Sequence, residues 1–240
     1  MLRRPARAFM ATPATSARDM RDVLALRHAR FNDRAEPEDS GFECILVRDT
    51  TTGEPVCTFR LMRFASGAEL ARSYSARYYD LGALAEYPEA ILEIGRFCVA
   101  ENARDPSILR TAWAHVATEV RAGNIGLLIG CSSFSGTSAD PYEDAFALLA
   151  QQHLAPKRWL PRVKAPAVLR FARRFRLRKP DLKKAARTMP PLLKSYLAMG
   201  GWVSDHAVLD RDLNTLHVFT GVEVGRIPPN RARLLFGPAG

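Results

Sequence analysis

LEIGRFCV, residues 92–99, is the stretch of this sequence that decides most about its fold. Its apolar residues predict a strand from Ile91 to Val99 that is interrupted by Gly95. In a regular strand Glu93 and Arg96 point to opposite faces, because their separation is odd. A β-bulge at Gly95 shifts this phase by one residue and can bring both charged side chains to one face. The alternative is an edge strand whose Glu and Arg point into water, and the spacing alone does not decide between them.

The segments around this strand predict an α+β chain in which helices cover a sheet. Upstream, strands are expected over residues 42–48 and 56–64, joined as a hairpin by the turn 49–54. Residues 65–90 are mixed in character and match no single element. Downstream, the expected elements are a helix from Ser107, a strand over 126–134, a helix from Asp140 to about His153, a short helix after Pro190-Pro191 and a last strand over 216–224.

An arginine falls on the apolar face of the first expected helix. The stripe at helical spacing consists of Met20, Val23, Leu24, Arg27 and Phe31. A buried guanidinium needs an acidic partner, because an unpaired buried charge is very costly. We therefore expect acidic side chains to lie across from Arg27.

The bulk composition is that of one medium soluble domain: 240 residues, of which 47% are hydrophobic and 25% are charged. No apolar run approaches the length of a membrane-spanning helix, and the basic N-terminus lacks the apolar region of a signal peptide. The four cysteines are far apart and form no C-x-x-C pair. These features predict a cytoplasmic protein without a disulfide framework or a metal site.

The formal net charge of +10 is concentrated in one segment, residues 157–187. Thirteen lysines and arginines fall in this segment, and Asp181 is its only acidic residue. Such a run favours an anionic partner, which can be nucleic acid, anionic lipid or an acidic protein. The segment lacks the interleaved aromatic residues and the motifs of nucleic-acid readers, so no nucleic acid is expected. A basic nucleic-acid-binding protein nevertheless stays the alternative from another functional class.

Within this basic segment, helical spacing places three apolar residues, Val168, Phe171 and Phe175, near one face. Arginines interrupt them along the chain: Arg170, Arg173, Arg174, Arg176 and Arg178. This pattern is that of a helix lying in a membrane interface, with arginines meeting anionic headgroups. Two other interpretations are left open, a solvated basic helix and a docking face for an acidic acyl carrier protein.

The LEIGRFCV strand resembles the Glu-x-x-Arg strand of acyl-homoserine-lactone (autoinducer) synthases. It resembles more closely the corresponding strand of the ornithine-lipid N-acyltransferases. The resemblance extends from Thr15 to Val224 and departs at His206, where the family pattern has glycine. The segments that carry it, in the same order along the chain, are LRHARF at 26–31, DSGFE at 39–43, TFRL at 58–61, GCSSF at 130–134, HLAP at 153–156 and PPLLKSYLAMGGWVSDHAVLDRDLNT at 190–215.

The resemblance implies a single GNAT-like acyltransferase domain over residues 1–240, with a basic insertion at about 157–187. It implies transfer of a 3-hydroxyacyl group from acyl carrier protein to the α-amine of L-ornithine, giving lyso-ornithine lipid. No cofactor of its own is expected, since phosphopantetheine arrives on the carrier. The enzyme would work in the cytoplasm, and a peripheral contact with an anionic inner membrane is expected. The nearest alternatives are an acyl-homoserine-lactone synthase and an amino-acid lipid enzyme that acts on another amine.

One local feature agrees with a carrier-protein donor. CoA-using GNAT enzymes place a glycine-containing loop after the corresponding strand, which wraps the pyrophosphate on a helix N-terminus. Here the stretch is AENARDPS, residues 100–107, which contains no glycine. A carrier-bound donor has no such pyrophosphate, and the acidic carrier suits a basic surface.

The expected mechanism is direct acyl transfer from the thioester to the amine. Glu93 is the candidate general base, acting directly or through a water. Backbone N–H groups freed at Gly95 would bind the oxyanion. The polar cluster expected to orient this corner consists of Arg96, Arg27 and Arg60 with Asp39 and Glu43.

Four further residues are candidates for binding rather than for covalent chemistry. Ser132 and Ser133 suggest a nucleophile, but the sequence has no G-x-S-x-G elbow and no convincing histidine partner for them. Asp205, like Asp210, is a candidate partner for the second amine of ornithine, with an acidic turn residue as the alternative.

Overall fold

Strand β5 (Ala90–Val99) contains the LEIGRFCV stretch and joins two structural units of the chain. The computed structural model describes residues 8–31 and 41–236. Unit 1 consists of Met1–Met62, Ile94–Ala122 and Leu235–Gly240, and unit 2 consists of Arg63–Glu93 and Gly123–Leu234. The single acyltransferase domain expected from the sequence stays a prediction.

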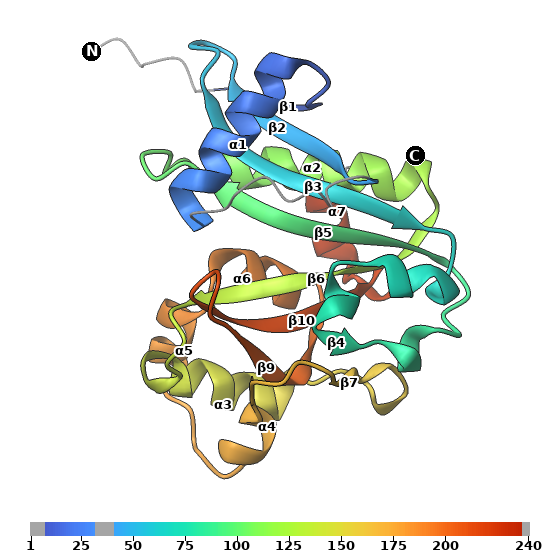
Figure 1. The fold of residues 1–240 in the computed structure, drawn as a ribbon, viewed down its shortest axis with the longest axis vertical. Coiled ribbons are helices and arrows are strands. Elements are labelled where there is room, and N and C mark those ends of the chain that lie inside the picture. The colour runs from blue at the N-terminus through green and yellow to red at the C-terminus, as the bar shows by residue number, and fades with distance from the viewer. Residues whose placement is uncertain (1–7, 32–40, 237–240) are drawn as a thin grey trace. The chain divides into compact units, whose positions relative to one another are not determined.

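Unit 1 is built on strands in the order β1-β2-β3-β5. β1 (Phe9–Pro13) pairs antiparallel with β2 (Glu43–Asp49), which pairs antiparallel with β3 (Pro55–Phe64). The hairpin predicted for β2 and β3 is confirmed, and its turn uses Gly53 at φ +74°. Helices α1 (Ala17–Phe31) and α2 (Pro106–Ala122) lie on opposite faces of these strands (Figure 1).

The two faces of unit 1 bury different side chains. Val23 and Leu26 of α1 pack with Cys44, Leu46 and Cys98. On the other face, Phe59 stacks on Phe97 and meets the edge of His115 from α2. Arg27 is only 2% exposed, so its predicted place on the buried side of the helix is confirmed.

Unit 2 is built on strands in the order β6-β10-β9-β8, with every registered pair antiparallel. These strands are β6 (Ile125–Ser135), β10 (Thr215–Glu223), β9 (Trp202–Asp210) and β8 (Val168–Leu169), and β4 (Tyr79–Asp80) pairs separately with β7 (Arg162–Val163). The helices are α3 (Glu143–Gln152), α4 (Phe171–Arg174), α5 (Leu182–Thr188), α6 (Pro191–Ala198) and α7 (Pro229–Phe236). Short 3₁₀ turns complete the unit at η2 (Gly67–Arg72), η3 (Ser75–Arg77), η4 (Gly82–Leu84), η5 (Asp140–Tyr142), η6 (Lys157–Trp159) and η7 (Val224–Arg226). The α+β class with mostly antiparallel strands and flanking helices is therefore confirmed.

The basic segment does not form the interfacial helix that its spacing predicts. Val168 belongs to β8 and pairs with Val208, and α4 covers only Phe171–Arg174. Phe171 and Phe175 are buried against Phe146 of α3, so the expected membrane anchors belong to the core. Helical spacing places aromatic residues on one face, but it does not tell a face that meets lipid from one that meets another helix. Among the described residues, no helix is both long and apolar enough to span a membrane.

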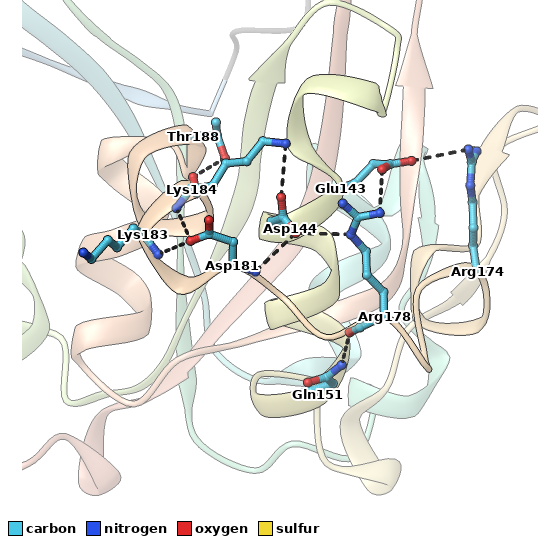
Figure 2. A network of polar contacts seen from close by, with 9 residues as sticks. All are labelled: Glu143, Asp144, Gln151, Arg174, Arg178, Asp181, Lys183, Lys184 and Thr188. Atoms are coloured by element: carbon cyan, nitrogen blue, oxygen red, sulfur yellow. Dashed lines mark hydrogen bonds and ion pairs between the residues drawn. The ribbon is translucent and has the colours of Figure 1, made fainter.

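The five arginines expected to dock a partner differ in their surroundings. Arg170, Arg173 and Arg176 are exposed. Arg174 is 54% exposed and lies 4.0 Å from Glu143. Arg178 instead turns inward to Glu143 and Asp144, as Figure 2 shows. Arg178 is therefore held in ion pairs with α3, and the docking role expected for these five arginines stays a prediction.

The burial of Phe171 can be tested by a pair of substitutions. Phe171→Ala should lower the free energy of unfolding by about 3–5 kcal/mol, because it removes a fully buried aromatic side chain and leaves a cavity. Leu177→Ala, at a side chain that is 87% exposed, should change it by less than about 0.5 kcal/mol. Urea unfolding of both variants measures this difference. Equal losses would show that Phe171 is not a core residue.

Candidate active site

The Glu93 carboxylate is buried and fixed by three donors from one short turn. Oε1 accepts hydrogen bonds from the Ser75 amide at 2.8 Å and the Ser75 hydroxyl at 2.6 Å. Oε2 accepts one from the Tyr74 amide at 2.9 Å. Glu93 is 1% exposed, and donors of this kind stabilise a buried carboxylate in its charged form. Both oxygens of the candidate base therefore face protein donors.

The turn that meets Glu93 lies in the region that the sequence leaves unassigned. The Ser73 hydroxyl accepts the Ala76 amide at 3.1 Å, and 3₁₀ bonds close the turn through Arg77 and Tyr78. The turn is held near β6, since the Ser75 hydroxyl lies 3.5 Å from Cys131 Sγ. Ser75 thus joins the candidate base to the β6 strand, a role that no sequence motif indicates.

β5 is irregular just after Glu93, as the sequence predicts, but the irregular residue is Arg96. Its φ of +49° lies in the left-handed region, which side-chain-bearing residues seldom adopt. A residue in this conformation inside a strand is typical of a bulge and costs on the order of 1–3 kcal/mol. A Cβ at Gly95 would stand 3.2 Å from Arg60 Nε, a tight contact that a small shift of the Arg60 side chain would have to relieve.

Arg60 occupies the interior of unit 1. It is 1% exposed, and its guanidinium stacks on the Phe42 ring at 4.0 Å. The register pairs Arg60 with Cys44, whose side chain packs toward α1, and pairs Glu43 with Leu61. Successive side chains alternate, so Arg60 and Glu43 leave the hairpin on opposite faces.

Not every residue of the predicted polar cluster lies in the described part of the chain. Arg27, Arg60, Gly95 and Arg96 belong to unit 1, where both Arg27 and Arg60 are buried. Asp39, the first acidic partner proposed from the sequence, lies outside the described residues. The pairing of Asp39 with these arginines stays a prediction.

The two candidate serines of β6 differ in their surroundings. Ser132 is 2% exposed and accepts a hydrogen bond from the Thr220 hydroxyl at 3.1 Å, which ties β6 to β10. Ser133 is half-buried and lies directly opposite His217 in the ladder. Neither geometry is that of a strained nucleophile turn, which agrees with the missing G-x-S-x-G elbow.

Two buried histidines and Tyr79 form a cluster in unit 2 that the sequence does not reveal. The Tyr79 hydroxyl donates to the His217 carbonyl at 2.7 Å and lies 3.2 Å from His217 Nδ1. The Tyr79 ring packs against His217 and His206, with centroids 5.6 and 5.2 Å away. Tyr78 meets the edge of His217 at 5.0 Å. The tyrosine-rich stretch therefore covers β9 and β10.

A bulge in β9 places His206 in this cluster. The register slips between Val218 and Thr220, and the Ser204 hydroxyl accepts the Phe219 amide and donates to the His206 carbonyl. His206 Nδ1 lies 2.7 Å from the Asp205 carboxylate. Asp205, the candidate partner for a substrate amine, already contacts a buried imidazole, and its side chain is 41% exposed.

The burial of these groups changes their protonation. Burial, with a smaller effect of nearby His206, lowers the pKa of His217 to about 4, so His217 is neutral at pH 7. Burial also raises the pKa of Tyr79 well above its ordinary value. The cluster therefore contributes hydrogen bonds near neutral pH, and neither Tyr79 nor His217 carries a charge there.

A separate pocket in unit 2 has a volume of about 310 Å³. It is lined by His153, Leu197, Trp202, Glu223 and Arg226 among others, and none of the candidate site residues lines it. Among the described residues, no three of His, Cys, Asp and Glu are arranged to hold a metal ion.

The family model described as "Acetyltransferase (GNAT) domain" matches residues 21–114. L-ornithine N(alpha)-acyltransferase of Rhodobacter capsulatus is 33% identical over 225 residues, which cover 85% of this chain and 86% of that protein. The protein of the same name from Brucella abortus is 30% identical over 208 residues, covering 80% and 71% of the two chains.

A solved structure shares the fold at low identity. FeeM, an N-acyl amino acid synthase from uncultured soil microbes, aligns with 92% of this chain and 94% of its own, with a TM-score of 0.52. The identity is 9%, so this likeness concerns the fold alone.

The neutral His217 predicts how stability responds to acid. The pKa in the folded state, about 4, lies below the unfolded value of about 6.5, so the unfolded chain binds the extra proton. The extra proton that His217 binds in the unfolded chain should therefore lower the free energy of unfolding by up to about 3 kcal/mol as the pH falls from 6.5 to 4. Urea unfolding across this range should show a smaller loss for His217→Gln than for the wild type. Parallel curves for the two proteins would contradict the assignment, and His28→Gln, at an exposed histidine, is the matched control.

Proposed function

Because this chain belongs to the family of L-ornithine N(alpha)-acyltransferases, we propose that it transfers a 3-hydroxyacyl group from acyl carrier protein to the α-amine of L-ornithine. The product is lyso-ornithine lipid, which makes this the first step of ornithine-lipid synthesis. The enzyme is an acyltransferase, and the observation that supports the acceptor most directly is the identity of 33% across most of the chain.

The reaction proposed for this site is direct acyl transfer. The neutral amine attacks the thioester carbonyl, the C–N bond forms, and the C–S bond breaks as the oxyanion collapses. The amine loses one proton, and the departing phosphopantetheine thiolate gains one. No covalent enzyme intermediate is required, since the thioester is already activated.

Glu93 is the proposed proton acceptor, and Ser75 is its proposed link to the substrate. The Ser75 hydroxyl donates to Glu93 Oε1 at 2.6 Å, so it can pass its proton to the carboxylate as it takes one from the amine. The left-handed backbone at Arg96 supports the bulge whose N–H groups we propose as the oxyanion site.

The N-terminus of α2 supports the carrier-protein donor. In CoA-using relatives the pyrophosphate binds the N–H groups at such a helix start. Here Asp105 Oδ1 accepts the Ser107 amide at 2.9 Å and also the Ser107 hydroxyl. The Asp105 carboxylate therefore caps the N-terminus of α2 from the residue before the helix, where it satisfies a donor and repels a diphosphate.

The donor preference can be tested by comparing two thioesters. At equal concentration, the 3-hydroxyacyl carrier protein should give a kcat/KM at least about tenfold higher than the matching acyl-CoA, because Asp105 opposes the pyrophosphate. Asp105→Asn should narrow this ratio by improving turnover of acyl-CoA. Equal or better turnover of acyl-CoA by the wild type would refute the proposed donor.

The proposed base predicts a large rate loss in Glu93→Gln. Removing a general base costs on the order of 10²–10⁴ in rate, and Ser75→Ala should lower the rate in the same direction. The side-chain amide of the Glu93→Gln variant faces a backbone donor, so this substitution should also lower the free energy of unfolding. Urea unfolding measures that loss, and the rate is normalised to the amount of folded protein. Glu54→Gln, at an exposed glutamate, serves as the matched control. Wild-type acylation of ornithine by folded Glu93→Gln would eliminate Glu93 as the base.

The proposed place of this chemistry is the cytoplasm, where the carrier protein is found, with a peripheral contact to the inner membrane that receives the lipid. The exposed cations of residues 157–187 support an anionic partner at this surface.

A further inference from the structure

The connection between α4 and α5, together with the start of α5, carries the two most exposed large apolar side chains in the described part of the chain. Leu177 is 87% exposed and Leu182 is 58% exposed. Both lie within residues 176–183, RLRKPDLK, which we name the leucine loop. A single exposed leucine needs no explanation. Here two strongly exposed leucines lie five residues apart in a stretch that is rich in cations.

The charges of the leucine loop divide into two sets. Arg176, Lys179 and Lys183 have exposed side chains, which leaves them available to a partner. Arg178 and the adjacent Lys184 turn to α3 instead, with Arg178 Nη1 2.8 Å from Glu143 and Lys184 Nζ 3.2 Å from Asp144. The single acid of the loop, Asp181, caps α5 by accepting the Lys183 and Lys184 amides. The outward side of the loop is therefore cationic and apolar.

The loop is held in place from within, as Figure 2 shows. The Gln151 side chain donates to the Arg178 carbonyl at 2.6 Å, and the Asp181 amide donates to Asp144 at 3.3 Å. Asp144 also accepts from Arg178 Nε at 3.2 Å, and this contact lowers the pKa of the Asp144 carboxyl. These bonds fix the backbone at residues 178 and 181, so Leu177 and Leu182 are presented by an ordered loop.

We propose that the leucine loop docks the protein on bilayers that contain anionic lipids. Leu177 and Leu182 insert at the level of the acyl chains, and Arg176, Lys179 and Lys183 meet the headgroup phosphates. A side chain that is 87% exposed projects from the surface, which suits insertion into a fluid interface, whereas a protein partner needs a complementary surface around it. The reason for such docking rests on the proposed function, because the proposed product is an amphiphile.

The test is co-sedimentation of the purified full chain with vesicles of phosphatidylcholine that contain 30% phosphatidylglycerol. The wild type should bind these vesicles and not vesicles of phosphatidylcholine alone. Leu177→Ser with Leu182→Ser should lower the partition coefficient at least about tenfold. Changing Arg176, Lys179 and Lys183 to Gln should lower it by about 100-fold at low salt.

Matched controls separate the loop from general effects. Met10→Ser removes a 56% exposed apolar side chain from β1, and Arg18, Arg110 and Arg211 changed to Gln remove three exposed charges elsewhere. Both controls should bind vesicles as the wild type does. Urea unfolding confirms that each variant is folded.

Two results would overturn the docking proposal. One is that the wild type does not bind the anionic vesicles, or that the leucine and charge variants bind them as strongly as the wild type does. The other is unchanged vesicle binding with a rise in KM for the acyl carrier protein, which would assign the loop to the carrier. Vesicle binding is measured without acyl transfer, so failure of the docking proposal is distinguishable from failure of the proposed reaction.

Discussion

The hydrogen bonds to the buried Glu93 carboxylate organise the part of unit 2 that holds the candidate base. A carboxylate that is 1% exposed requires donors, and the chain supplies them from the backbone of Tyr74 and Ser75. The same turn leads directly into Tyr78 and Tyr79, which pack on His217. The buried Glu93 carboxylate thus fixes a segment whose sequence has no helical or strand periodicity. That segment in turn covers the histidines of β9 and β10.

The sequence predicts the regular elements well, because their side chains alternate or repeat at helical spacing. The hairpin β2–β3, β5, β6, β10 and the helices α1 to α3 follow from these patterns, and the GNAT-like fold is confirmed. β9 is missed because Ser204, Asp205 and His206 form a bulge that breaks the alternation. The lipid-facing position that spacing predicts for Phe171 and Phe175 is wrong. Helical spacing places the two side chains on one face, but it does not show what that face packs against.

The candidate site is predictable only where it coincides with a motif. Glu93, Gly95 and Arg96 stand in one strand, and the expected irregularity lies one residue later than predicted. Ser75 and His217 carry no local signal, since each gains its role from a contact with a distant part of the chain. The surroundings of the charged residues are not predictable from the sequence either. The sequence shows thirteen cations in residues 157–187, but only the fold shows that Arg178 pairs with Asp144 while Arg176 is exposed.

The central claim is that this chain acylates the α-amine of ornithine. Mass spectrometry of lipids from bacterial cells that express the protein, and otherwise make no ornithine lipid, tests it most directly. The account predicts a new lipid in which a 3-hydroxyacyl chain is amide-linked to the α-nitrogen of ornithine, and its absence from cells expressing Glu93→Gln. An unchanged lipid profile, an acyl-homoserine lactone or acylation of another amine would contradict it.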